Sequence, residues 1–110
     1  MTTVEFYLKE KNIIGFKVSG HTGFAKRGED IVCSAVSALT QTALIGLEKV
    51  AGAKVEYSIK DGFLQCRIID TRTELGAIKC SAILETLYEG LKNIEATYEN
   101  YIRLSDKEEV

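Results

Sequence analysis

Hydrophobic and polar residues alternate at the start of the chain, which is typical of half-buried strands. Two strands are expected, with apolar faces formed by Val4, Phe6 and Leu8 in the first and by Ile14, Phe16 and Val18 in the second. The polar residues Glu10–Asn12 separate them, so the two strands should form a hairpin.

A helical period replaces the alternation at Ile31. Apolar residues then recur at spacings of three and four, at Val32, Val36, Leu39, Ala43 and Leu47. Asp30 suits the N-cap and Gly52 the C-terminal end of this helix. The other faces are also apolar as far as Glu48, which predicts a helix that is buried on nearly every side.

The segment Val55–Ile69 predicts a hairpin whose register follows from its turn. Asp61-Gly62 is a strong signal for a two-residue turn. It sets Lys60 opposite Phe63, followed by the pairs Ile59–Leu64, Tyr57–Cys66 and Val55–Ile68 on one face and Ser58–Gln65 and Glu56–Arg67 on the other. The first face is apolar and the second gains an opposite-charge pair, so register and pattern agree. Cys66 is therefore expected to pack in the core.

Capping-box spacing of Thr71 and Glu74 predicts the start of a second helix. The apolar stripe of this helix consists of Cys80, Ile83, Leu87, Leu91 and Ile94, which assigns Cys80 to packing as well. Alternation predicts a last strand over Thr97–Leu104, and Ser105–Val110 is expected to be a frayed acidic tail.

These elements occur in the order β-β-α-β-β-α-β, which predicts an α+β fold. Tight turns join the paired strands, so we expect a mostly antiparallel sheet with two helices packed on one face. The length of 110 residues fits a single domain over residues 1–110.

Composition narrows the class of protein. The net charge of −2 gives no overall field that would favour nucleic acid or an anionic membrane. No signal peptide and no apolar run long enough to cross a bilayer are expected. The three cysteines lack CxxC spacing, which favours reduced thiols in the cytoplasm over disulfides or a zinc site. We expect neither a metal nor an organic cofactor.

The candidate chemistry lies between Gly20 and Ser37. His21, the only histidine, begins a loop that contains Gly23 and Gly28, and Cys33 falls in the first turn of the following helix. Unpaired N–H groups and the positive end of the helix dipole favour an anionic sulfur there and could hold an oxyanion. His21 could fold back as the general base of a His–Cys dyad. Ser37 lies one turn on from Cys33, on the same face.

The residues alone leave several alternatives open. Cys33 could be a small core residue, His21 a residue that bonds a turn carbonyl, and Asp30 a cap and no more. A non-catalytic ribosome- or RNA-associated domain could use Lys26, Arg27 and the helix N-terminus to bind phosphate. A scaffold subunit with a dimer interface is the third possibility. The loop lacks the spacing of known nucleotide-binding glycine motifs.

A resemblance changes the balance between these alternatives. The run G-H-T-G-F-A at Gly20–Ala25, followed by G-E-D-I-V-C-S-A-V-S-A-L at Gly28–Leu39, resembles the signature of the ribosomal-processing cysteine protease family, Prp. That signature is G-H-x-G-[YF]-A, a short spacer and G-x-D-I-V-C-[AS]-A-V-S. The chain length and the order of elements also agree with the family. Departures are small: Thr22 stands where Ala is common, and Phe24 where Tyr is.

The resemblance implies a cysteine endopeptidase that removes a short N-terminal extension from a large-subunit ribosomal protein, number twenty-seven. Such enzymes cut after an aromatic residue and before a small one, through a thioester acyl-enzyme. The catalytic residues of the family fall on His21 and Cys33, with Asp30 in the same motif. From its position on the helix, Ser37 is a possible supporting residue. The loop residues Gly20, Thr22, Gly23, Phe24 and Gly28 are expected to contact the substrate peptide. A cytoplasmic homodimer is implied, with no membrane and no nucleic acid contact except through the ribosome.

Overall fold

The computed structural model describes residues 1–20 and 30–109. Its elements are β1 (Thr2–Lys9), β2 (Asn12–Ser19), α1 (Ile31–Ile45), the π-helical turn η2 (Gly46–Val50), β3 (Lys54–Lys60), β4 (Phe63–Asp70), α2 (Glu74–Thr97) and β5 (Ile102–Glu108). This order confirms the predicted β-β-α-β-β-α-β arrangement. Two β-hairpins are each followed by a helix, and the last strand, β5, joins one edge of the sheet.

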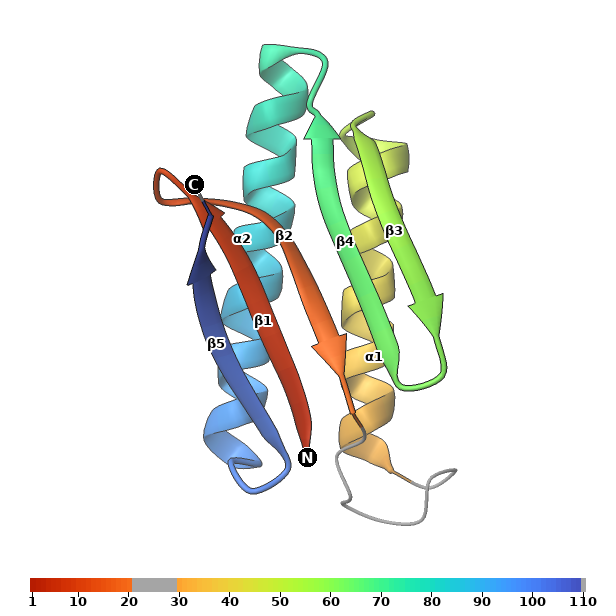
Figure 1. Cartoon of the computed structure of the whole chain (residues 1–110), viewed down its shortest axis with the longest axis vertical. Coiled ribbons are helices and arrows are strands. Elements are labelled where there is room, and N and C mark those ends of the chain that lie inside the picture. Colours follow the sequence, from red (N-terminus) through yellow and green to blue (C-terminus); the bar gives the residue numbers. More distant parts are fainter. Residues whose placement is uncertain (21–29, 110) are drawn as a thin grey trace.

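The five strands form one sheet in the order β3-β4-β2-β1-β5. β1 pairs with β5 in parallel, and the other three pairs are antiparallel. Both helices lie on the same side of this sheet, as Figure 1 shows. The α+β prediction of a mostly antiparallel sheet with helices on one face is therefore confirmed.

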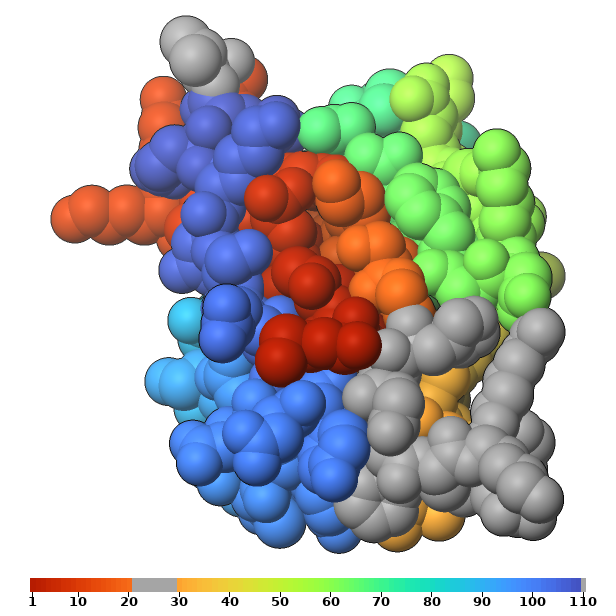
Figure 2. All heavy atoms as spheres, turned by 60° about the horizontal axis from the view of Figure 1, so that its bottom comes forward, coloured from red at the N-terminus to blue at the C-terminus, as the bar shows by residue number. Residues whose placement is uncertain are grey.

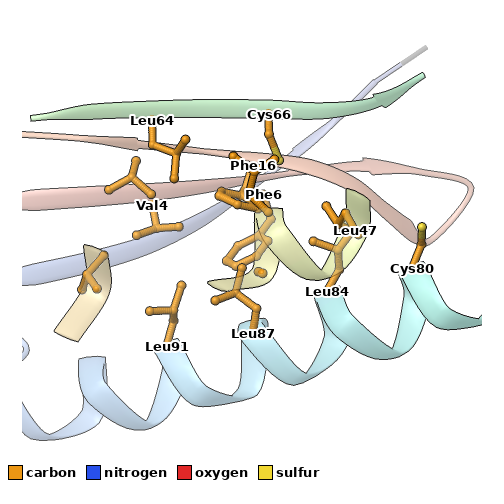
Figure 3. Close-up of a cluster of buried hydrophobic side chains, with 14 of the residues drawn as sticks. Val4, Phe6, Phe16, Leu47, Leu64, Cys66, Cys80, Leu84, Leu87 and Leu91 are labelled. Atoms are coloured by element: carbon orange, nitrogen blue, oxygen red, sulfur yellow. The ribbon is translucent and has the colours of Figure 1, made fainter. Parts of the chain in front are cut away.

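The core fills the space between the sheet and the helices. Val4, Phe6 and Phe16 are fully buried on the inner face of the sheet, and Leu84 and Leu91 are fully buried on α2 (Figure 3). The Phe6 ring also meets the ring of Tyr88 edge-on, with centroids 4.9 Å apart. The predicted strand faces are confirmed at Val4, Phe6, Phe16 and Val18 but are wrong at Leu8 and Ile14, because the β1–β2 register shifts after Tyr7 and Ile13 packs against the core instead. The predicted stripe of α2 is confirmed, with Leu84 in addition.

The predicted register of the β3–β4 hairpin is confirmed at every pair, but its apolar face is only half covered. Leu64 and Cys66 on β4 are buried, whereas their partners Ile59 and Tyr57 on β3 are 49% and 54% exposed. β3 is an edge strand, and in Figure 1 its lower half stands to one side of α1. Local pattern predicts which residues share a face but not how far the helix layer extends over that face.

The prediction that α1 is buried on nearly every side is wrong. Ile31 and Ile45 are each 58% exposed, and Leu39 is exposed as well. A helix in a two-layer fold covers the sheet with one face and leaves the other face to solvent. Thr40 is buried in place of Leu39, and its hydroxyl donates to the Val36 carbonyl at 2.8 Å. Gly52 follows the helix with a φ of +70°, as expected for a glycine at a helix end.

α2 begins with Thr73 as its N-cap, so the capping box predicted for Thr71 and Glu74 is wrong. The Thr73 hydroxyl accepts a hydrogen bond from the Gly76 N–H at 2.8 Å. Thr71 instead accepts the Thr73 N–H with its carbonyl, in a turn where Arg72 adopts a φ of +68°. That turn moves the helix start two residues further along the chain.

The last strand lies later than predicted. α2 continues to Thr97, and Ser105–Glu108, expected to be a frayed tail, belongs to β5 and pairs with β1. The Glu109 N–H then donates to the Leu8 carbonyl, and the Glu109 carboxylate bonds Arg67 at 3.1 Å. The acidic side chains of this segment stay in solvent while its backbone completes the ladder.

The helical run Ile31–Val50 has 20 residues and a mean hydropathy of 1.5, so length and composition alone would let it cross a membrane. This differs from the expectation that no apolar run is long enough. A core helix has the same character, and Val36, Leu44 and Leu47 pack into the core cluster.

Candidate active site

The site is built around the first turn of α1. Asp30 has extended backbone angles and is 3% exposed, and its carboxylate accepts a hydrogen bond from the Cys33 N–H at 2.9 Å. The predicted N-cap is therefore confirmed. Asp30 also accepts the Ser34 N–H with its backbone carbonyl, so Cys33 is fixed at the third helical position.

Cys33 is half-buried and opens onto a cleft of about 540 Å³. One wall of the cleft is α1, and the other is the β3–β4 hairpin from Ile59 to Leu64. Figure 2 looks towards this end of the molecule, where the hairpin (green) and α1 (gold) reach the surface. The alternative that Cys33 is one more core residue is wrong, because its side chain lines a cleft.

Ser37 lies in the same cleft one helical turn after Cys33, as predicted. Its hydroxyl accepts a hydrogen bond from Gln41 Nε2 at 2.8 Å, and Gln41 also lines the cleft. The sequence reasoning missed Gln41. The spacing of four and eight residues from Cys33 could have found it, because such residues share one helix face.

Gly20 also lines the cleft. Its φ is +86°, and its N–H donates to the Gly62 carbonyl in the turn of the hairpin at 2.9 Å. A Cβ at this position would stand 2.6 Å from the Met1 carbonyl oxygen, so both the backbone angle and the close approach require glycine. Gly20 is thus the one predicted loop residue that the structure places at the cleft.

The other predicted loop residues lie outside the described part of the chain. These are His21, Thr22, Gly23, Phe24 and Gly28, together with Lys26 and Arg27. The structure therefore places Cys33, Ser37 and Gly20 around one cleft, with Asp30 behind Cys33 as its cap, and the His21–Cys33 pairing stays a prediction.

The other two cysteines are packed in the core, as predicted. Cys66 is fully buried, and burial raises the pKa of its thiol from 9.0 to about 12. Cys80 is also buried, and desolvation raises the pKa of its thiol. Both thiols are therefore protonated at neutral pH, and protonated thiols are poor nucleophiles.

A metal site requires several ligating side chains at one place. Within residues 1–20 and 30–109, no three His, Cys, Asp or Glu side chains come together as a metal site. The chemistry that the described residues offer is a thiol at a helix N-terminus, beside hydroxyl and amide groups.

A family model described as "Cysteine protease Prp" matches residues 1–103. The chain belongs to the Prp cysteine protease family. A relative from Bacillus subtilis, named ribosomal processing cysteine protease Prp, is 26% identical over 98 residues, which cover 87% of this chain and 88% of the relative. A relative of the same name from Staphylococcus aureus is 29% identical over 111 residues, which cover 97% and 100% of the two chains.

A solved Prp structure agrees with this membership. The S. aureus Prp crystal structure in complex with a covalently linked product peptide is 25% identical, with a TM-score of 0.87, and the match covers 97% of this chain and all of that one. The chain is therefore a cysteine protease. This finding overturns the two non-catalytic alternatives, an RNA-associated domain and a scaffold subunit.

Proposed function

We propose that this Prp protease removes a short N-terminal extension from a large-subunit ribosomal protein precursor, cutting after an aromatic residue. Two relatives are named as ribosomal processing proteases, and the S. aureus structure holds a product peptide. The enzyme acts in the cytoplasm as a homodimer. Three cysteines without CxxC spacing favour that reducing compartment, and the exposure of several large apolar side chains, Ile78 among them, favours association.

The observation that carries the proposal is the position of Cys33. All three cysteines lie in the described part of the chain, and among them Cys33 alone is partly exposed, in the cleft between α1 and the β3–β4 hairpin. Cys66 and Cys80 are buried and held in the thiol form. Cys33 is accordingly assigned as the nucleophile, in the first turn of α1.

His21 is assigned as the general base. It follows Gly20 in the chain, and Gly20 lines the same cleft as Cys33. His21 takes the proton from Cys33 Sγ, and the thiolate attacks the carbonyl carbon of the scissile peptide bond. Collapse of the tetrahedral intermediate breaks the C–N bond, and His21 returns the proton to the leaving amine. Water then hydrolyses the thioester and frees the acyl segment.

The oxyanion of the tetrahedral intermediate needs backbone N–H groups that the helix cap does not already use. The Cys33 N–H is already donated to Asp30 and the Ser34 N–H to the Asp30 carbonyl. The first-turn donors left for the oxyanion are therefore the N–H groups of Ile31 and Val32, which have no carbonyl partner within an α-helix. Asp30 is assigned as the group that fixes Cys33, since its carboxylate is the N-cap.

A peptide that spans the processing site tests the assignment. Cys33→Ala and His21→Ala should both lose cleavage, while Cys66→Ala and Cys80→Ala should keep it in the folded fraction. Cleavage products are measured by mass spectrometry, and the fold of each variant by circular dichroism. Full cleavage by the Cys33→Ala protein would sink the proposal.

A further inference from the structure

The inner face of β3 is an apolar surface that is half exposed at Ile59 and Tyr57. Ile59 and Tyr57 share this face, because residues two apart on a strand point the same way. Their partners on β4, Leu64 and Cys66, are 5% and 0% exposed, yet Ile59 and Tyr57 are about half exposed. The surface is therefore turned towards the helix layer but lies beyond the reach of α1.

This surface continues the cleft that contains Cys33. Ile59 is itself a lining residue of that cleft, and Tyr57 follows it along the strand. The opposite wall is the face of α1 that carries Cys33, Ser37 and Gln41. We refer to the space between Ser37 and Gln41 on one side and Ile59 and Tyr57 on the other as the α1–β3 groove.

The two walls of the α1–β3 groove offer different contacts. The Gln41–Ser37 hydrogen bond uses one amide N–H and one hydroxyl lone pair. The Gln41 carbonyl, its second N–H and the Ser37 O–H can still bond a peptide backbone. β3 supplies apolar side chains, and as an edge strand it pairs with β4 on one side in the described sheet. An extended peptide suits such a groove, since strand edges bind main chain and alternate side chains fill apolar positions.

The dimensions fit a short extended segment. Cys33 and Gln41 are eight residues apart on the helix, which corresponds to about 12 Å at 1.5 Å per residue. An extended chain rises about 3.3 Å per residue, so this wall matches about four substrate residues. The segment on the acyl side of the cut must stay in place through both steps, because it is bound to Cys33 as the thioester.

We propose that the α1–β3 groove binds the extended segment on the N-terminal side of the cut and selects apolar side chains at alternate positions of that segment. Ile59 and Tyr57 are the specificity-determining residues, and Ser37 with Gln41 holds the peptide backbone. This inference rests on the proposed function, because it assumes that Cys33 cleaves a peptide. It adds which part of the substrate is read and by which residues.

Three peptides of equal length test the inference. The parent has apolar residues at alternate positions N-terminal to the cut, the second has two of these replaced by serine, and the third has the two intervening residues replaced by serine. Wild-type enzyme should lose about tenfold in kcat/KM on the second peptide, mainly through KM, and little on the third. The double variant Tyr57→Thr/Ile59→Thr should cleave the parent about tenfold more weakly and no longer distinguish the peptides.

A matched control separates the groove from general surface effects. Ile69 on β4 is 47% exposed, so Ile69→Thr removes a similar apolar side chain that does not line the cleft, and it should keep wild-type discrimination. Threonine is used because it keeps the preference of these positions for strand. Thermal melting and the alkylation rate of Cys33 should show that the double variant keeps its fold and its nucleophile.

The outcomes divide as follows. Equal cleavage of all three peptides by wild type would overturn the groove proposal and leave the proposed function standing. The groove proposal would also be overturned if the double variant distinguished the peptides as wild type does. The same conclusion would follow if the double variant changed its oligomeric state and kept wild-type kinetics, because a second copy of the chain would then occupy the surface. Failure of wild type to cleave any of the three, with Cys33 alkylated normally, would overturn the proposed function and this inference with it.

Discussion

Substitution of Asp30 can show whether this residue acts as a helix cap or as a catalytic carboxylate. Its carboxylate caps α1 by accepting the Cys33 N–H, and an asparagine could accept the same hydrogen bond with its amide oxygen. We expect Asp30→Asn to keep cleavage within a fewfold of wild type, and Asp30→Ala to lower the free energy of unfolding by about 1 kcal/mol. Urea unfolding and peptide cleavage measure the two effects. A loss of about 10⁴ in kcat for the asparagine variant would instead show a triad carboxylate.

Cys66 predicts a pH dependence of stability. Burial raises the pKa of its thiol from 9.0 to about 12, so the folded state holds this proton more tightly than the unfolded state. The stabilisation is complete below pH 9.0 and is lost as the pH rises towards about 12. The slope is about 1.4 kcal/mol per pH unit. Cys66→Ala should therefore lose stability less steeply than wild type above pH 9.0, measured by urea unfolding at several pH values. Equal slopes would contradict this account.

Single residues also show where sequence reasoning stops. The caps and turns at Asp30 and Gly62 follow from local chemistry, and the structure confirms both. Tyr7 alternates with the apolar face of its strand, which predicts that it points to the outer side with Glu5 and Lys9, yet it is 2% exposed. Arg67 lies 4.1 Å from its ring centroid, and Gln65 Nε2 donates to its hydroxyl at 2.8 Å. These partners come from β4, so no local pattern could have indicated them.

At the scale of elements, β5 turns the C-terminal segment into part of the fold. Residues Ser105–Glu108 pair with Glu5–Leu8 of β1, and Arg67 binds Glu109. A chain ending at Leu104 would lose these backbone bonds and expose one edge of β1. We expect it to be less stable by about 3 kcal/mol, at about 1 kcal/mol for each net hydrogen bond. Thermal and urea unfolding measure the loss.

The matched control for this truncation is Glu109→Ala. It removes a partly exposed ion pair, which should cost less than about 1 kcal/mol. If the truncated chain proved as stable as the full chain, the segment would behave as the frayed tail that its charge pattern indicates.

Contacts close in sequence were predictable, and distant ones were not. The β3–β4 register follows from a two-residue turn, so every pair could be derived from Asp61-Gly62. β5 pairs with β1, which lies at the other end of the chain, and the second half of β5, Ser105–Glu108, contains no apolar residue that would indicate a strand. How much of β3 is buried by α1 depends on the position of the helices relative to the sheet, and the period of apolar residues carries no information on that position. The same holds for the cleft: Cys33 and Ser37 follow from helix spacing, but its hairpin wall does not.

For the whole molecule, the prediction concerns oligomeric state. The chain has a mass of 12.2 kDa, and its exposed large apolar residues include Leu75 and Ile78 on α2, at 59% and 65% exposure. Apolar surface of this kind favours association, because burying it removes it from water. We therefore expect light scattering to give twice the monomer mass at micromolar concentration, with dissociation on dilution. A monomer at all concentrations would contradict the homodimer, and cleavage by that monomer would show that one chain holds a complete site.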